Sequence, residues 1–146
     1  MKNPNTGKTF LDVDDINAIL PDKLKLNPKS VSRGVYQSAN GTLISISNSR
    51  VYEKGYTAWY YIYADRYKEL GVDYMLFTVG LTGFVLLPME EFQDFKLGCC
   101  WKPGRFRGEK RYRVDINKRG EEYYLLNPSK RHLNKINATK YFYKSI

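Results

Sequence analysis

The chain of 146 residues has few of the residues from which metal centres and disulfide frameworks are built. It contains two cysteines, Cys99 and Cys100, and a single histidine, His132. Adjacent cysteines cannot join distant parts of a chain, and these residues do not supply the four ligands of a structural zinc site. We therefore expect no disulfide framework, no metal and no cofactor.

Long apolar runs are also missing. No window approaches the ~20 apolar residues that a membrane helix needs. The first residues, "MKNPNTGKTFLDVDD", lack the basic and then apolar regions of a secretory signal. These two absences predict a cytoplasmic protein with no membrane partner.

Motifs for common enzyme chemistries do not occur. The sequence has no GxSxG, no phosphate-binding glycine loop followed by lysine, and no GxGxxG at the start of a helix. Two nuclease alternatives stay open. Asp73 with Asp94-Phe95-Lys96 has tolerable spacing for a metal-dependent centre, and His132 lies among basic residues that could serve metal-free RNA cleavage. The helical pattern around Asp94 and the position of His132 near the C-terminus favour a protein without a catalytic residue.

Acidic residues are scarce in the last third of the chain. Residues 1–100 hold eleven basic and eleven acidic residues, whereas residues 101–146 hold thirteen basic and four acidic ones. The formal net charge of +9 therefore lies entirely in the last third. This concentration indicates an electropositive face for a polyanion, and the alternative is a basic face that is only solvated.

One stretch, "WKPGRFRGEKRYRVDINKRG", carries most of this charge. Lysines there would contact phosphates, arginines would clamp phosphates or read base edges, and the aromatic residues would stack on a base or wedge a step. A basic group near the C-terminus would extend the same surface. The candidate nucleic-acid-binding residues are Trp101, Lys102, Arg105, Phe106, Arg107, Lys110, Arg111, Arg113, Lys118, Arg119, Lys130, Arg131 and His132.

The expected elements are short. A helix over 12–20 ends before Pro21, and a second helix over 65–70 ends at Gly71. Three hairpins are predicted from period-two patterns and turn residues: 30–38 with 42–47, 73–80 with 83–88, and 109–117 with 121–127. An aromatic strand over 57–64, a short helix over 89–96 and a tail with a helical turn and a strand complete the set.

This order of elements predicts a single α+β domain over 1–146, dominated by a curved antiparallel sheet or open barrel with short helices. Residues 1–29 would form an N-terminal helix and connector, and residues 30–146 a sheet-rich DNA-binding core. Arg111 and Arg113 alternate with Tyr112 and Val114, so their strand would turn charge to one face and apolar side chains to the core.

The layout from Gly34 onward resembles the non-catalytic domains that accompany the nuclease domains of bacterial restriction enzymes. The similarity lies in "GVYQSANGTLISIS", "AWYYIYADRYKEL", "DYMLFTVGLTGFVLLPMEEF" and "YRVDINKRGEEYYLL". It implies a DNA-recognition barrel, with some relatives that read sequence or base modification. We expect no catalytic domain within these 146 residues, which is a departure from the pattern of such enzymes.

We therefore expect a DNA-binding module of a restriction or other defence-related system, acting with a separate nuclease subunit or domain. RNA is the alternative nucleic acid. The alternative functions are a small nuclease, metal-dependent or metal-free, and an interaction protein that blocks a nucleic-acid enzyme.

Overall fold

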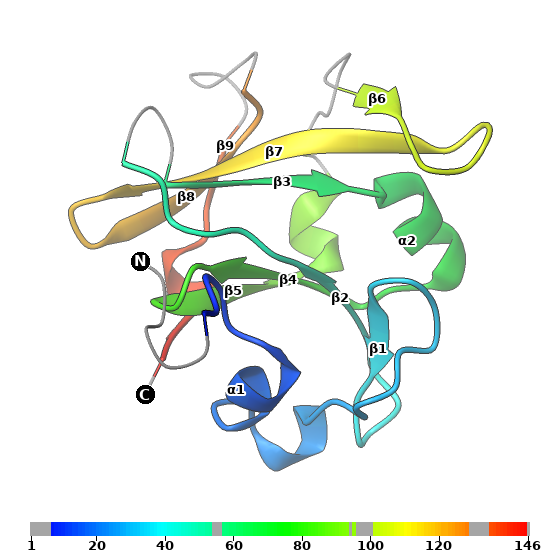
Figure 1. Cartoon of the computed structure of the whole chain (residues 1–146), viewed down its shortest axis with the longest axis horizontal. Helices are drawn as coiled ribbons and strands as arrows, with labels where there is room; N and C mark the ends of the chain where they lie inside the picture. The colour runs from blue at the N-terminus through cyan, green and yellow to red at the C-terminus, as the bar shows by residue number, and fades with distance from the viewer. Residues whose placement is uncertain (1–6, 54–56, 94, 96–100, 129–134, 146) are drawn as a thin grey trace.

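A computed structural model describes residues 7–53, 57–93, 95, 101–128 and 135–145. The described residues form a single α+β domain of two β-sheets with short helices. Figure 1 shows the two sheets one above the other, with helix α1 beneath the lower sheet. The prediction allowed a curved antiparallel sheet or an open barrel. The sheets are not closed into a barrel, so the structure has sheets.

The first sheet has the strand order β1-β2-β4-β5-β10. Its strands are β1 (Val35–Gln37), β2 (Leu43–Ser47), β4 (Tyr74–Val79), β5 (Gly83–Pro88) and β10 (Phe142–Lys144). All neighbours are antiparallel except β2 and β4. Those two are parallel because the chain leaves the first sheet after β2, contributes a strand to the second sheet and a helix, and returns to enter β4 from the same end.

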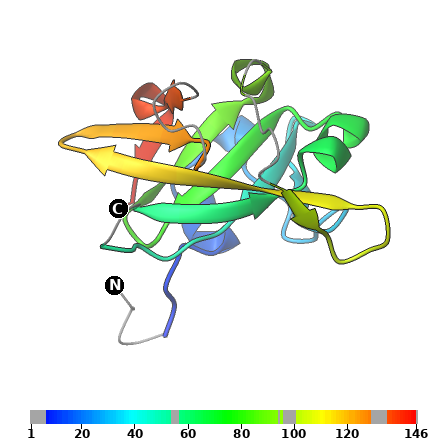
Figure 2. The same cartoon turned by 90° about the horizontal axis from the view of Figure 1, so that it is seen from above.

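The second sheet has the order β3-β7-β8-β9, and β6 pairs with β7 on the edge opposite β3, since Tyr112 pairs with Ile62 of β3 on one side and with Trp101 of β6 on the other. Its strands are β3 (Ala58–Ile62), β6 (Trp101–Pro103), β7 (Lys110–Arg119), β8 (Glu122–Leu126) and β9 (Lys135–Asn137). Strand β7 runs across the width of the molecule, with the β7–β8 turn at one end and the β6–β7 loop at the other (Figures 1 and 2).

The main core lies between the two sheets. Strand β4 turns Met75, Phe77 and Val79 toward it, and β7 contributes Val114 and Ile116. A second cluster covers the other face of the first sheet, where Leu76 contacts side chains of the N-terminal segment. The first sheet is therefore buried on both faces, which explains why β4 and β5 are nearly continuous apolar runs rather than alternating ones.

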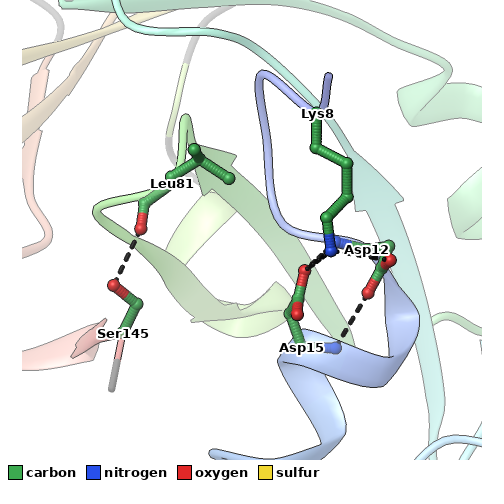
Figure 3. Close-up of polar contacts among 5 residues, drawn as sticks. All are labelled: Lys8, Asp12, Asp15, Leu81 and Ser145. Carbon is green, nitrogen blue, oxygen red and sulfur yellow. Dashed lines mark hydrogen bonds and ion pairs between the residues drawn. The ribbon is translucent and has the colours of Figure 1, made fainter. Parts of the chain in front are cut away.

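The N-terminal segment forms this outer layer. Helix α1 (Val13–Asn17) begins with a capping box, in which Asp12 accepts from the backbone N–H of Asp15 and Asp15 accepts from that of Asp12. Lys8 Nζ lies 2.8 Å from Asp15 and 3.1 Å from Asp12 (Figure 3). The buried side chains that this segment adds to the second cluster are those of Leu11, Ile16, Leu20, Leu24 and Leu26. The segment from Leu11 to Leu26 is thus packed on the first sheet.

The C-terminal strand closes the opposite edge of the same sheet. Ser145 Oγ donates to the carbonyl of Leu81, at 2.7 Å, in the turn between β4 and β5 (Figure 3). Beside it, β10 pairs with β5 in an antiparallel register. The predicted helical turn and aromatic strand of the tail are found as the 3₁₀ turn η3 (Thr139–Tyr141) and β10.

Helix α2 (Ala64–Leu70) connects the sheets and ends at Gly71, which has a φ of 73°. Only glycine adopts this left-handed conformation readily, so the predicted glycine cap is confirmed. A second 3₁₀ turn, η2 (Met89–Phe92), replaces the start of the helix predicted over 89–96, and Phe92 and Phe95 are buried.

Several boundaries differ from the prediction. Helix α1 ends at Asn17, three residues before the expected end, and a turn occupies 18–19. The 3₁₀ helix η1 (Asp22–Leu24) lies in the segment that was predicted as a connector. The three hairpins are present, and the turn at Asn40-Gly41 joins β1 to β2 with shorter strands than expected.

Candidate nucleic-acid interface

The face of the second sheet that points away from the core carries the charge of β7. Tyr112, Val114 and Ile116 are buried, whereas Arg111 and Arg113 are half-buried on the opposite face. The alternation predicted for this strand is therefore confirmed. We call this outward side of β3, β6, β7 and β8 the open face.

Guanidinium groups and aromatic rings alternate across the open face. Tyr61 pairs with Arg113, and Trp59 pairs with Asp115 across β3 and β7. The Arg111 guanidinium lies 4.3 Å from the centroid of the Tyr61 ring, and that of Arg113 lies 5.0 Å from the Trp59 ring. The Trp59 and Tyr61 rings meet edge to face at 5.4 Å. These contacts hold both arginines against the sheet and limit the rotamers they can adopt.

A buried carboxylate anchors one of these arginines. Asp115 is fully buried, and its Oδ1 accepts from Arg113 Nε at 3.1 Å. Arg111 has no such anchor, since its Nε is buried without a hydrogen-bond partner among the described residues. A buried donor in this state is costly, so Arg111 is held less firmly than Arg113 and depends on its contact with the Tyr61 ring.

The β6–β7 loop extends the open face at one end. Lys102, Arg105 and Arg107 are exposed, and Phe106 is 60% exposed. No salt bridge joins these three cations to a carboxylate of the described residues. In register, Lys102 lies beside Arg111 across β6 and β7, so the loop continues the same charged row.

A recess of about 330 Å³ lies beside this loop, where the second sheet meets β2 and α2. Three guanidinium groups line it, together with tyrosine rings and the end of β2. We call it the arginine recess, and its lining residues are Arg33, Gly34, Ile46, Ser47, Asn48, Tyr61, Tyr63, Arg66, Tyr67 and Arg105. Tyr61 and Arg105 belong both to this recess and to the charged surface next to it, so the two are continuous.

The guanidinium of Arg33 is fixed from several sides. Its Nη2 donates to both carboxylate oxygens of Glu109, at 2.9 and 2.8 Å. It also lies 4.5 Å from the Phe106 ring and 5.1 Å from the Tyr63 ring. This cluster connects the turn before β1 to the β6–β7 loop, because Glu109 and Phe106 come from that loop.

Arg66 comes from α2 and enters the recess from the other side. Its Nη2 donates to the Arg33 carbonyl, and its guanidinium lies 5.2 Å from the Tyr63 ring. Its Nε is buried without a hydrogen-bond partner among the described residues. Burial raises the pKa of Tyr67, which follows it in the helix and also lines the recess. The Tyr67 phenol is therefore neutral near pH 7 and adds no negative charge.

A second recess of about 410 Å³ lies on the other side of Tyr61. Trp59, Tyr52 and Arg50 line it, and the Arg50 guanidinium lies 4.7 Å from the Tyr52 ring. A hydrogen bond with Arg50 lowers the pKa of the Tyr52 phenol. Aromatic and cationic groups thus continue along the molecule on both sides of Tyr61.

The structure brings together about half of the residues predicted from the basic stretch. One group lies on the open face and its loop: Lys102, Arg105, Phe106, Arg107, Arg111 and Arg113. Lys110 is exposed at the start of β7 but follows the alternation of Tyr112, toward the other side of the sheet. Trp101 begins β6, and its side chain lies outside the described part, as do Lys130, Arg131 and His132.

Two predicted residues lie far from this group. Lys118 and Arg119 are at the opposite end of β7, about 24 Å and about 27 Å from Arg111 at the usual rise of a strand. Lys118 follows the alternation of the buried residues, and its Nζ lies 5.8 Å from the Tyr123 ring. The basic stretch is therefore spread along a strand, and its two ends do not form one patch.

Arg33 and Arg66 were missed by the sequence analysis. Both lie in the first hundred residues, where basic and acidic residues balance, so charge counting draws no attention to them. A usable signal was the spacing of Arg66 and Tyr67 in the predicted helix and of Tyr63 just before it, which places rings and a guanidinium on one side once the helix begins after Tyr63.

The described residues do not form a catalytic centre for either nuclease alternative. The Asp73 carboxylate accepts from the backbone N–H of Leu43 at 3.0 Å, at the end of the first sheet. Asp94 and Lys96 lie outside the described residues, as does His132. Within the described part of the chain, no group of three His, Cys, Asp or Glu side chains is arranged to hold a metal ion. No helix there is long and apolar enough to cross a bilayer.

Comparisons with known proteins do not assign this chain to a family. No family model, no curated protein and no solved structure matches the chain.

Proposed function

We propose that this protein is a nucleic-acid-binding module that contacts DNA through the open face and the β6–β7 loop. The observation that carries the proposal is the continuous row of Lys102, Arg111 and Arg113 next to the exposed Arg105 and Arg107. The carboxylates at this end, Glu109 and Asp115, are engaged with Arg33 and Arg113. The loop cations therefore remain available for phosphates.

The aromatic partners of the arginines support the same function. A guanidinium held over a ring keeps its planar fork oriented, which favours two-point contacts with phosphate or with a guanine edge. Arg111 would donate through groups that its ring contact with Tyr61 leaves exposed at the surface. Phe106, exposed at the tip of the loop, would stack on a base or enter a groove.

Affinity for a duplex as a function of salt concentration tests the proposal. We expect wild-type affinity to fall steeply with salt, because cations of the open face displace counterions from DNA. The double variant Lys102→Ala/Arg107→Ala removes two exposed cations. It should reduce the slope of log K against log salt by about 2 and the affinity at 0.15 M salt by about thirtyfold.

A matched control changes the same charge elsewhere. Lys23 and Lys29 are exposed in the N-terminal segment. The variant Lys23→Ala/Lys29→Ala should leave the slope unchanged. Equal losses in both double variants would show that net charge alone, and not this surface, attracts DNA. Undetectable or salt-independent binding of the wild type would contradict the proposal.

The setting that we propose is a restriction or other defence-related system in the cytoplasm, in which this chain acts with a separate nuclease subunit or domain. The layout resemblance to recognition domains of restriction enzymes supports this part. Incubating the protein with plasmid DNA and with RNA, with and without Mg²⁺, separates a binding module from a nuclease. Cleavage by the purified protein would favour the enzyme, and binding without cleavage favours the module.

A further inference from the structure

The arginine recess has properties that a duplex-binding face does not need. Two of its guanidinium groups, those of Arg33 and Arg66, come from outside the basic stretch. They are set in a hollow beside the open face, whereas the phosphates of a regular duplex lie on its convex surface. We propose that the recess binds a phosphomonoester at the end of a nucleic-acid strand. This inference rests on the proposed function.

Charge is the first argument. Three arginines line the recess, and the only carboxylate that forms a salt bridge with any of them, among the described residues, is Glu109. The adjacent Asp65 is turned away, since it accepts from the Tyr112 hydroxyl at 3.0 Å and lines a different recess. The remaining charge of about +2 matches a phosphomonoester, which carries about −1.5 to −2 near pH 7. An internal phosphodiester carries half of that.

The second argument is an unused donor. Arg66 Nη2 is taken by the Arg33 carbonyl, and Arg66 Nε is buried with no acceptor in the described part of the chain. Leaving such a donor without an acceptor is unfavourable, and native structures usually provide a partner. A rotation of the Arg66 side chain would bring this N–H to a phosphate oxygen in the recess, and Arg105, exposed at the rim, would contact the phosphate from the loop side.

The third argument is that the site is rigid before a ligand arrives. Glu109 and the rings of Tyr63 and Phe106 hold Arg33, and the Arg33 carbonyl holds Arg66. Little side-chain entropy is then lost on binding. The recess is also continuous with the open face through Tyr61 and Arg105, so a strand end of bound DNA can reach it.

Two short duplexes of one sequence, with hydroxyl ends or with 5′-phosphate ends, test the inference; a third carries 3′-phosphates. We expect the wild type to bind one phosphorylated form about tenfold more tightly than the hydroxyl form. Arg66→Gln should abolish this preference and leave the affinity for hydroxyl-ended duplex within about twofold. Arg105→Gln, at an exposed position that does not threaten folding, should reduce the preference in the same direction.

Arg50→Gln is the matched control, because Arg50 also lies over a tyrosine but lines the neighbouring recess. It should keep the full preference for phosphate. Equal binding of all three duplexes by the wild type would overturn the inference while leaving the proposed function intact. Failure of the wild type to bind the hydroxyl-ended duplex would instead contradict the proposed function.

Deoxyadenosine monophosphate and deoxyadenosine, titrated separately and followed by NMR shifts, distinguish the source of the phosphate. Binding of the monophosphate alone, lost in Arg66→Gln, together with a preference for phosphorylated ends supports the inference. Binding of the monophosphate with no preference among duplexes would assign the recess to free nucleotides and overturn the strand-end assignment.

Discussion

The two sheets differ in how many of their faces are covered. The first sheet packs against the second on one side and against the N-terminal segment on the other, so β4 and β5 are almost wholly buried. The second sheet packs on one side only, and β3 shows a strict alternation of buried and half-buried residues. The covered sheet supplies stability, and the half-covered sheet has a face on which charge can be placed.

The same difference explains where arginine can be tolerated. A guanidinium on the first sheet would have to enter an apolar cluster and lose its hydration. On the open face, Arg111 and Arg113 keep contact with water while their stems and ring partners cover the sheet. Asp115 is the exception, a buried carboxylate on the same face that is paired with Arg113.

The largest effect should come from opening the core between the sheets. Phe77 is fully buried in β4, and Phe77→Ala should lower the free energy of unfolding by about 3–5 kcal/mol, because it leaves a cavity. Phe106→Ala, at a 60% exposed position of the loop, removes one ring contact of Arg33 and should change that free energy by no more than about 1 kcal/mol. Urea denaturation measures both. Similar losses would break the distinction between the covered and open regions.

An intermediate effect should come from the buried carboxylate of the open face. Asp115→Ala removes the acceptor of Arg113 Nε, and we expect a loss of about 2–3 kcal/mol in unfolding free energy. Since Arg113 is 33% exposed, water can replace part of the interaction, which keeps the loss below that for a fully buried pair. The exposed Glu122→Ala on β8 is the control and should be nearly neutral. A neutral Asp115→Ala would show that the open face needs no internal carboxylate.

The smallest effect concerns the covered side of β3. Burial raises the pKa of Tyr60 well above 10.0, and the nearby Asp115 carboxylate acts in the same direction. The unfolded chain therefore loses this proton near pH 10 while the folded protein keeps it. The stabilisation is complete below pH 10 and declines as pH rises above it, by at most about 1.4 kcal/mol per pH unit for this group.

Tyr60→Phe tests this pH dependence. The variant removes the hydroxyl that donates to the Thr78 carbonyl at 2.7 Å, so it should cost about 1 kcal/mol at pH 7. Between pH 10 and 11 its unfolding free energy should fall less steeply than that of the wild type. Parallel denaturation series across this range measure the difference, and equal slopes would mean that Tyr60 ionises alike in both states.

Much of the local structure follows from short-range patterns. The alternation in "AWYYI" and "RYRV" correctly assigned buried and outward residues, since successive side chains of a strand point to opposite faces. Gly71 and Asn40-Gly41 marked a helix end and a turn because few other residues tolerate those backbone conformations. Helix α1 was predicted too long because the apolar spacing of Val13, Ile16 and Leu20 continues into a turn that also packs on the sheet.

The candidate site was predictable only in part. The composition of the last third indicated Arg111, Arg113 and the loop, because like charges close in sequence are also close in space over a few residues. Lys118 and Arg119 lie apart from these residues, since an extended strand separates residues that are near in sequence. Arg33 and Arg66 could not be found by counting charge, because their meeting depends on the contact between α2, the turn before β1 and the β6–β7 loop.

Periodicity and composition were enough to find the three hairpins and β3, to assign their apolar faces, and to count the positive charge of the last third, whereas the short strands β6 and β9 were not predicted. That one sheet is covered on both faces and the other on one, and that Arg33, Arg66 and Arg105 line a common recess, became visible in the folded protein alone. Those outcomes depend on which elements pack together. The residues that meet are far apart in the sequence, so local patterns do not predict their contacts.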